Sequence, residues 1–212
     1  MSCIVILLLA LSAIMSSTAL AEADPVTTVV ISVPDQKLGV VREGKTVARY
    51  PVSTSKFGIG DRFGSYRTPV GEMEIAAKIG NGLRSGSVLK GRVPTGEILE
   101  PNAPGRDPIV TRILVLRGRE ERNRNATSRG IYIHGTTEEK RLGKPVSYGC
   151  IRMRSRDVIT IFGMVNVGSR VLISKEKLKT ACKSVTMDGA GQVADSKKKR
   201  TGAPYADSSE SI

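Results

Sequence analysis

Short apolar segments separated by glycine and proline constrain this chain more than any other feature. The 212 residues include 22 glycines and 10 prolines, which divide the sequence into many brief runs. Runs of alternating or β-branched residues predict strands at 29–33, 38–41, 46–52, 73–79, 109–116, 131–133 and 171–173. The Glu43-Gly44 pair between the second and third runs predicts a hairpin. Many short strands joined by turns are typical of a mainly β domain.

One segment has helical spacing, and another has no regular pattern. Apolar residues recur at helical intervals between Val158 and Val165, and Ser155 stands where an N-cap is expected. The segment from Gly80 to Arg106 is rich in glycine, proline and scattered charge, so we expect a long loop or an insertion over a site.

The two ends of the chain differ in composition from the middle. Residues 1–21 are apolar and end in Ala-Leu-Ala, which predicts a cleaved signal peptide, with an uncleaved anchor as the alternative. Residues 22–182 form the predicted domain, and residues 183–212 are predicted to be a disordered tail. The basic run Lys197–Arg200 in that tail is either a wall or lipid tether or a solvated charge run.

The charge balance favours an anionic neighbour. The chain has 33 Lys and Arg against 20 Asp and Glu, a net charge of +13. Export and an aromatic content of only 4% argue against nucleic acid as the partner. One histidine and three cysteines exclude a zinc finger or an iron–sulfur protein built by this chain alone.

The only histidine, His134, and the cysteine sixteen residues later, Cys150, form the candidate reactive pair. A free thiol is mostly protonated at neutral pH, and a neighbouring imidazole activates it by taking the proton. Gly149 permits a tight turn, in which the backbone N–H groups of Gly149 and Cys150 would stabilise an oxyanion. Arg152 has the planar fork that suits a substrate carboxylate.

Other interpretations of these cysteines stay open on the residues alone. Cys150 and Cys182 could be structural, or could form a disulfide in an oxidising compartment. A papain-like peptidase also combines cysteine with histidine, but there the cysteine comes first in the chain, whereas here the histidine does.

The region from Ser128 to Asp157 resembles the active-site signature of the L,D-transpeptidase family, the YkuD-type domain. That signature joins a His-Gly pair, through a spacer, to a Ser-His-Gly-Cys turn followed by Ile-Arg. Residues 51–55 and 68–71 are similar to the PVSTG and TPxG segments of the family, and the resemblance covers about residues 27–175. It implies a β-sandwich-like catalytic domain with one or two short helices.

The resemblance also implies a role for each residue of the motif. Cys150 would be the nucleophile, His134 its base, and Gly135 the main-chain carbonyl that orients the imidazole. It places three further residues at the substrate pocket and the oxyanion site: Arg152, Ser147 and Gly149. Tyr148 is also expected at the substrate pocket, but it departs from the pattern, because the family has histidine there. A tyrosine donates hydrogen bonds but is no base at neutral pH, so we expect Tyr148 to support the loop.

The reaction implied is attack on the L-to-D peptide bond of a peptidoglycan stem peptide, with release of D-Ala. An amine of a second stem, or of a wall-linked lipoprotein, would then resolve the thioester, and carbapenems would acylate the cysteine. The reaction implied needs no metal and no cofactor. We expect the protein in the periplasm or cell wall, with no membrane span after cleavage. The alternatives are an L,D-carboxypeptidase on the same fold and a peptidoglycan-binding domain that has lost its chemistry.

Overall fold

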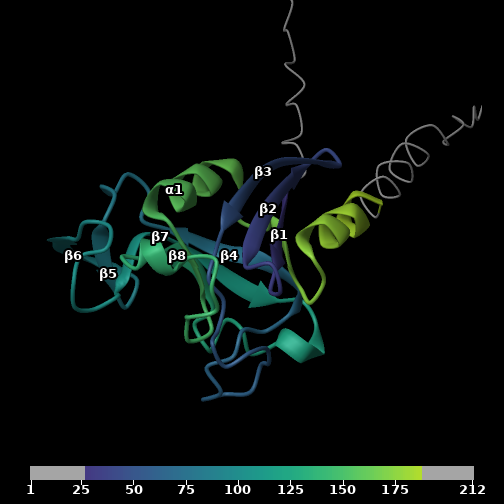
Figure 1. Cartoon of the computed structure of the whole chain (residues 1–212), viewed down its shortest axis with the longest axis horizontal. Helices are drawn as coiled ribbons and strands as arrows, with labels where there is room; N and C mark the ends of the chain where they lie inside the picture. Colours follow the sequence, from purple (N-terminus) through teal and green to yellow (C-terminus); the bar gives the residue numbers. More distant parts are fainter. Residues whose placement is uncertain (1–26, 188–212) are drawn as a thin grey trace, which may run out of the picture.

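The computed structural model describes residues 27–187, which fold around one mixed sheet of ten strands (Figure 1). The strands are β1 (Thr27–Ser32), β2 (Lys37–Arg42), β3 (Lys45–Pro51), β4 (Gly71–Ile79), β5 (Ser87–Lys90), β6 (Val93–Ile98), β7 (Ile109–Gly118), β8 (Tyr132–Gly135), β9 (Ile151–Met153) and β10 (Arg170–Ser174). Their order is β3-β2-β1-β10-β4-β7-β5-β6, and β8 lies between β7 and β9. The predicted mainly β class and the hairpin around Glu43-Gly44 are confirmed.

The sheet curves so that both of its halves face one core. The main hydrophobic cluster takes Ile31 and Leu38 from one half and Leu116 and Ile151 from the other. Strand pairing is antiparallel except between β1 and β10 and between β8 and β9. The shared core is what makes the single sheet sandwich-like.

Helix α1 (Ser155–Met164) closes this core, as the helical spacing predicts. Its own residues Val158 and Ile161 are fully buried on the face that packs against the core. The predicted N-cap is wrong by one residue: Arg154 occupies the N-cap position, and Ser155 is the first helical residue. The backbone N–H of Ser155 instead donates to Glu139 Oε1 at 3.0 Å. Glu139 begins the short 3₁₀ helix η2 (Glu139–Arg141), so a carboxylate from another segment caps the helix.

A second cluster covers the opposite face of β1 and β2. Residues 178–187 are helical, and Leu178, Cys182 and Val185 pack there against Val30. The helix therefore extends five residues beyond the boundary that the sequence analysis places after Cys182. The predicted signal peptide, residues 1–21, and the basic run at 197–200 lie outside the described residues.

The segment 80–106, expected to be a long loop or an insertion over a site, contains the hairpin β5–β6. The loop alternative is wrong, and the strand was missed because all six residues of β6 are exposed, which leaves no alternation of apolar and polar residues to indicate it. The hairpin joins the sheet through only two residue pairs between β5 and β7. Figure 1 shows it at one edge of the molecule, away from the helix of residues 178–187.

A bulge in β7 shapes the sheet next to the site. The register between β7 and β8 shifts between Val110 and Ile113, and Thr111 there has a φ of +73°. A β-branched residue rarely adopts this left-handed conformation, and such strain concentrates at functional sites. The Thr111 hydroxyl stabilises the bulge, lying 2.7 Å from Ser155 Oγ and accepting from the Gly86 backbone N–H at 2.9 Å.

Candidate active site

The parallel pair β8–β9 brings the two halves of the sequence motif together. Its register places His134 opposite Arg152, while Ile133 and Ile151 form the neighbouring pair and enter the core. Since side chains alternate along a strand, His134 and Arg152 project from the face opposite the core. Cys150 immediately precedes β9, two residues before Arg152. Parallel pairing thus links segments sixteen residues apart in sequence.

His134 is buried, and its orientation is set by its own neighbour. Its Nδ1 lies 2.8 Å from the carbonyl oxygen of Gly135, and the side chain is 5% exposed. A carbonyl oxygen only accepts, so this contact selects the tautomer with the proton on Nδ1 and leaves the Nε2 lone pair available. The structure thus places Gly135 where the resemblance implies an orienting carbonyl.

Burial lowers the pKa of His134 to about 4. The hydrogen bond to Gly135 opposes this shift, the positive charge of Arg152 adds to it, and the negative charge of Asp107 opposes it. The imidazole is therefore neutral at pH 7 and able to accept a proton.

The thiol of Cys150 is also neutral in this structure. Its Sγ donates to the carbonyl oxygen of Gly130 at 3.2 Å. Burial raises the thiol pKa, against the lowering effects of a hydrogen bond from the Tyr132 backbone and of the charges of Arg152 and Arg129. The resting site therefore contains a protonated thiol and a neutral imidazole.

The turn of residues 147–150, which we call the catalytic turn, is held by its own serine. Ser147 Oγ donates to the carbonyl oxygen of Cys150 at 2.6 Å and accepts from the Gly149 N–H at 3.3 Å. Thr68 Oγ1, from a segment 81 residues earlier, donates to the Gly149 carbonyl at 2.9 Å. Ser147 and Gly149 thus shape the turn, and the Gly149 N–H, which the resemblance assigns to the oxyanion site, donates to Ser147 here.

Two glycines of the motif are required by close approaches. A Cβ on Gly135 would lie 2.5 Å from the Val110 carbonyl oxygen in the β7 bulge. Gly149 has a φ of +121°, and a Cβ there would lie 3.2 Å from Ile131 Cδ1 and 3.3 Å from the Arg67 carbonyl oxygen. A larger residue at either position would displace the nucleophile or the base.

Arg152 is held by two carboxylates. Its Nη1 lies 2.9 Å from Asp107 Oδ2 and 2.9 Å from Glu138 Oε2. Asp107 Oδ1 also accepts from the Thr136 hydroxyl at 2.5 Å and from the Thr137 N–H at 3.0 Å, just after His134-Gly135. The predicted role of Arg152 toward a substrate carboxylate would therefore use the rest of its guanidinium fork.

Tyr148 points outward. Its side chain is 55% exposed, and its hydroxyl accepts from Lys56 Nζ at 3.0 Å. The hydrogen bond and charge of Lys56 lower the pKa of the Tyr148 phenol. This solvent-facing position agrees with the expectation that Tyr148 is not the base.

The sequence analysis missed Asp107 and Arg129. The Arg129 side chain is 5% exposed and pairs with Asp61 at 3.1 Å, and its Nη2 donates to the Arg67 carbonyl at 2.7 Å. Arg129 lies within the motif region, but its role depends on a loop more than sixty residues earlier, which no local pattern reveals. Asp107 lies at the end of a segment with several prolines, residues 101–108, and belongs to no recognisable motif.

The cysteine alternatives are resolved for the described residues. Cys150 and Cys182 are both free thiols in the structure, and Cys182 packs in the second cluster instead. Within residues 27–187, no group of three His, Cys, Asp or Glu side chains could hold a metal ion. The helices of this same range are each too short or too polar to cross a membrane.

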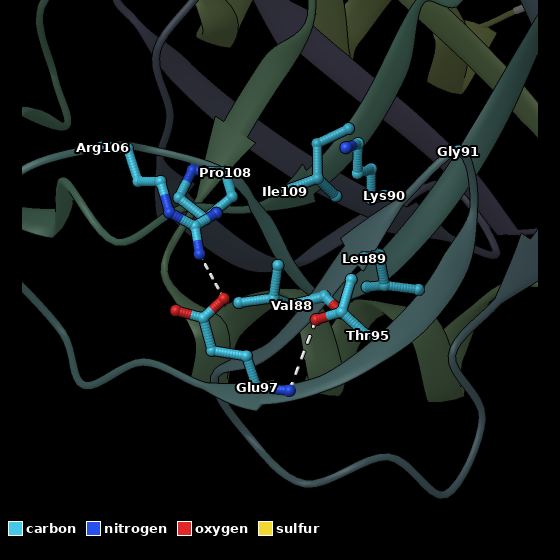
Figure 2. Close-up of a pocket in the computed structure, with 9 residues that line it drawn as sticks. All are labelled: Val88, Leu89, Lys90, Gly91, Thr95, Glu97, Arg106, Pro108 and Ile109. Carbon is cyan, nitrogen blue, oxygen red and sulfur yellow. Dashed lines mark hydrogen bonds and ion pairs between the residues drawn. The ribbon is translucent and has the colours of Figure 1, made fainter.

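A cavity of about 610 Å³ lies at the base of the β5–β6 hairpin and not at the thiol. Figure 2 shows Glu97 and Arg106 paired at one side of its lining, beside the apolar side chain of Val88. Arg106 and Pro108 flank Asp107, so this cavity adjoins the segment that contacts Arg152.

The geometry defines a cysteine–histidine site on a mainly β domain, and comparison with known proteins identifies its class. Residues 26–173 match the family model of the L,D-transpeptidase catalytic domain, YkuD. The chain therefore belongs to the L,D-transpeptidase catalytic domain family, as the motif resemblance predicts.

Individual relatives are more distant. YqjB of Bacillus subtilis, a protein named as an L,D-transpeptidase, is 29% identical over 149 residues, which is 70% of this chain and 71% of YqjB. An L,D-transpeptidase from Mycobacterium smegmatis is similar in structure, with a TM-score of 0.46 and 19% identity over 71% of this chain and 59% of that one. L,D-transpeptidase 3 from Mycobacterium tuberculosis, solved with a faropenem-derived adduct, gives a TM-score of 0.45 and 21% identity over 71% of this chain and 60% of that one.

Proposed function

We propose that this protein is an L,D-transpeptidase that cleaves peptidoglycan stem peptides through an acyl-enzyme on Cys150. The observation that carries the proposal is the His134–Gly135 contact at 2.8 Å on the strand paired with the segment that follows Cys150. That contact leaves Nε2 of His134 free to accept a proton, on the strand paired with the segment that follows the protonated Cys150 thiol. A base-activated nucleophile needs such a proton acceptor within reach of its thiol.

The reaction begins with both groups neutral. As the sulfur attacks the carbonyl carbon of the L,D peptide bond, the thiol proton moves to His134 Nε2. The tetrahedral intermediate collapses when that proton passes to the departing nitrogen, which releases D-Ala and leaves a thioester on Cys150. The amine of an acceptor then attacks the thioester and gives its proton to His134, and the proton returns to the sulfur as the new amide forms.

Arg152 would orient the donor by one of its carboxylates. Its Nη1 is occupied by Asp107 and Glu138, whose charges offset the cost of keeping the guanidinium 12% exposed. The remaining fork nitrogens would meet the stem peptide. The net charge of +13 favours the same anionic polymer without selecting it.

The finer assignments belong to this proposal. The acceptor would be a second stem, giving a 3–3 cross-link, or an amine of a wall-linked lipoprotein. Residues 1–21 would direct export to the periplasm or cell wall, where the substrate lies. Carbapenems would acylate Cys150, and the faropenem-derived adduct of the related mycobacterial protein supports testing β-lactams of this kind.

The test is intact-mass measurement of the purified protein after incubation with a disaccharide-tetrapeptide. We expect wild type to gain the acyl mass and release D-Ala, while Cys150→Ala gains nothing. Cys182→Ala is the matched control, because it removes the other described thiol and should retain the adduct. No adduct on wild type, with substrate or with a carbapenem, would refute the proposal. Cross-linked dimers among the products indicate transfer, and disaccharide-tripeptide as the only product besides D-Ala indicates a carboxypeptidase.

A further inference from the structure

Three exposed aromatic side chains form a cluster beside the catalytic turn. Phe57, Tyr66 and Tyr148, which we call the aromatic cluster, have ring centroids 5.7 to 6.0 Å apart in every pairing. They are 44%, 57% and 55% exposed, and none belongs to a hydrophobic core cluster. The whole chain has only eight aromatic residues, three Phe and five Tyr. Mutually packed rings left in solvent are typical of a binding surface.

The backbone holds one of these rings in a strained position. Tyr66 has a φ of +54°, a backbone conformation that residues other than glycine rarely adopt. Ser55 Oγ donates to the Tyr66 carbonyl at 2.5 Å, and the buried Arg129 donates to the next carbonyl, that of Arg67, at 2.7 Å. The surroundings therefore fix a conformation whose ring fills no core, and strain kept in this way marks ligand sites.

The aromatic cluster is continuous with the nucleophile. Tyr148 is two residues before Cys150, and the Tyr66 carbonyl oxygen would lie 3.6 Å from a Cβ on Gly149. Two residues span at most about 7 Å, so a ligand on the far rings lies roughly 10–15 Å from the sulfur. Between the lactyl group and the scissile bond a donor strand has three stem residues, which span about 10 Å or more when extended. Three stem residues are therefore long enough to place the first sugar on these rings.

The charges around the aromatic cluster suit the same ligand. The groups that act on the Tyr148 phenol are Lys56, Arg152 and Arg141, all cations, and they complement the carboxylates of a stem peptide. Lys56 Nζ lies 4.5 Å from the Tyr148 ring centre and 5.1 Å from that of Phe57. The faces of aromatic rings carry partial negative charge, which is why they attract the Lys56 ammonium. The C–H groups on the face of a sugar ring carry partial positive charge, so the same ring faces attract them.

We infer that the aromatic cluster is a saccharide subsite, which stacks a hexosamine ring of the donor glycan strand next to the catalytic turn. The inference rests on the proposed function for the identity of the ligand. It assigns to Phe57 and Tyr66 the task of distinguishing a stem peptide attached to sugar from the free peptide.

Equilibrium binding tests this without requiring turnover. In the Cys150→Ala protein, titration calorimetry would compare a disaccharide-tetrapeptide with the same tetrapeptide lacking sugar. We expect the disaccharide form to bind about tenfold more tightly, and the combined Phe57→Ala and Tyr66→Ala change to remove that difference while leaving the free tetrapeptide unchanged. Phe63→Ala is the matched control, since Phe63 is 59% exposed in the same loop and has no ring contact with the cluster.

Three outcomes would overturn the inference. Equal affinity for the two ligands in the parent would show that no sugar is bound. A preference that survives the double variant would place the sugar elsewhere, and an equal loss for both ligands would assign the rings to the peptide. Carbapenem acylation of the same double variant with Cys150 intact checks folding. Failure of the proposed function is seen separately, as absence of acylation in wild type.

Discussion

The catalytic turn and the β5–β6 hairpin are constructed in opposite ways. In the turn, Ser147 is fully buried and binds the backbone of Gly149 and Cys150. Thr68, 81 residues before Gly149, donates to the Gly149 carbonyl. In the hairpin, every residue of β6 is exposed, and β5 meets β7 through two residue pairs. The catalytic turn is held by contacts with distant parts of the chain, whereas the β5–β6 hairpin is held to the sheet by only two residue pairs.

This difference separates the rigid catalytic turn from the more loosely held β5–β6 hairpin. Local opening is costly where many long-range contacts must break and cheap where few do. The thiol and imidazole therefore keep their geometry, while the hairpin can move or vary without disturbing them. The cavity beneath the hairpin lies where such movement would alter access to the Asp107 segment.

The largest effect is expected from Gly149→Ala, which breaks the turn itself. The methyl group adds the strain of a φ of +121° to contacts at 3.2 and 3.3 Å, about 1–3 kcal/mol, and displaces Cys150. We expect the rate of carbapenem acylation to fall a hundredfold or more, measured by stopped-flow or intact mass. Gly143→Ala is the control, because Gly143 has a φ of +90° but open space around its Cβ. Equal losses in both variants would mean that strain alone matters.

Asp107→Asn should have the next largest effect. Its negative charge raises the pKa of His134 and balances Arg152, so the neutral amide makes His134 a weaker base. We expect acylation at pH 7 to slow about tenfold and the acid limb of the pH profile to move below its wild-type position near pH 4. Glu97→Gln, an acid of the hairpin, should leave both unchanged. A slower rate with an unmoved acid limb would assign Asp107 to the fold alone.

The pH dependence of alkylation sharpens the description of the turn. Burial raises the thiol pKa above its usual value, and His134 is neutral above about pH 4, so little thiolate exists at pH 7. In the Cys182→Ala background, iodoacetamide should react with Cys150 more slowly at pH 7 than with a free cysteine, and faster as pH rises past 9. A plateau between pH 4 and pH 9 would instead reveal a thiolate–imidazolium pair. Acylation is lost as pH falls through about 4, when His134 takes up a proton.

The smallest effect on acylation is expected from removing the hairpin. Replacing residues 87–98 with a short Gly-Ser link should leave carbapenem acylation within about threefold, because none of the catalytic contacts comes from β5 or β6. The ratio of cross-linked to hydrolysed product should change, as expected if this segment controls acceptor access. An unchanged ratio, measured by chromatography of the products, would remove that role from the hairpin.

Local pattern was sufficient for much of this molecule. Strands such as β4 and β7 alternate or are β-branched, α1 has helical spacing, and His134 and Cys150 lie in one contiguous motif. Contacts between distant segments were not predictable: Glu139 caps α1 in place of Ser155, and Asp107 reaches Arg152 across the fold. The β5–β6 hairpin was missed because a strand exposed on both faces needs no apolar alternation.

The protonated state of the Cys150 thiol affects how readily the nucleophile is inactivated by oxidation. Peroxides and disulfides react with thiolates, and a cysteine that stays protonated is oxidised slowly to sulfenic acid. Burial and the hydrogen bond to the Gly130 carbonyl keep the sulfur protonated until the proposed attack on a substrate, when the proton would pass to His134. The nucleophile is therefore durable under oxidising conditions without a second cysteine to regenerate it.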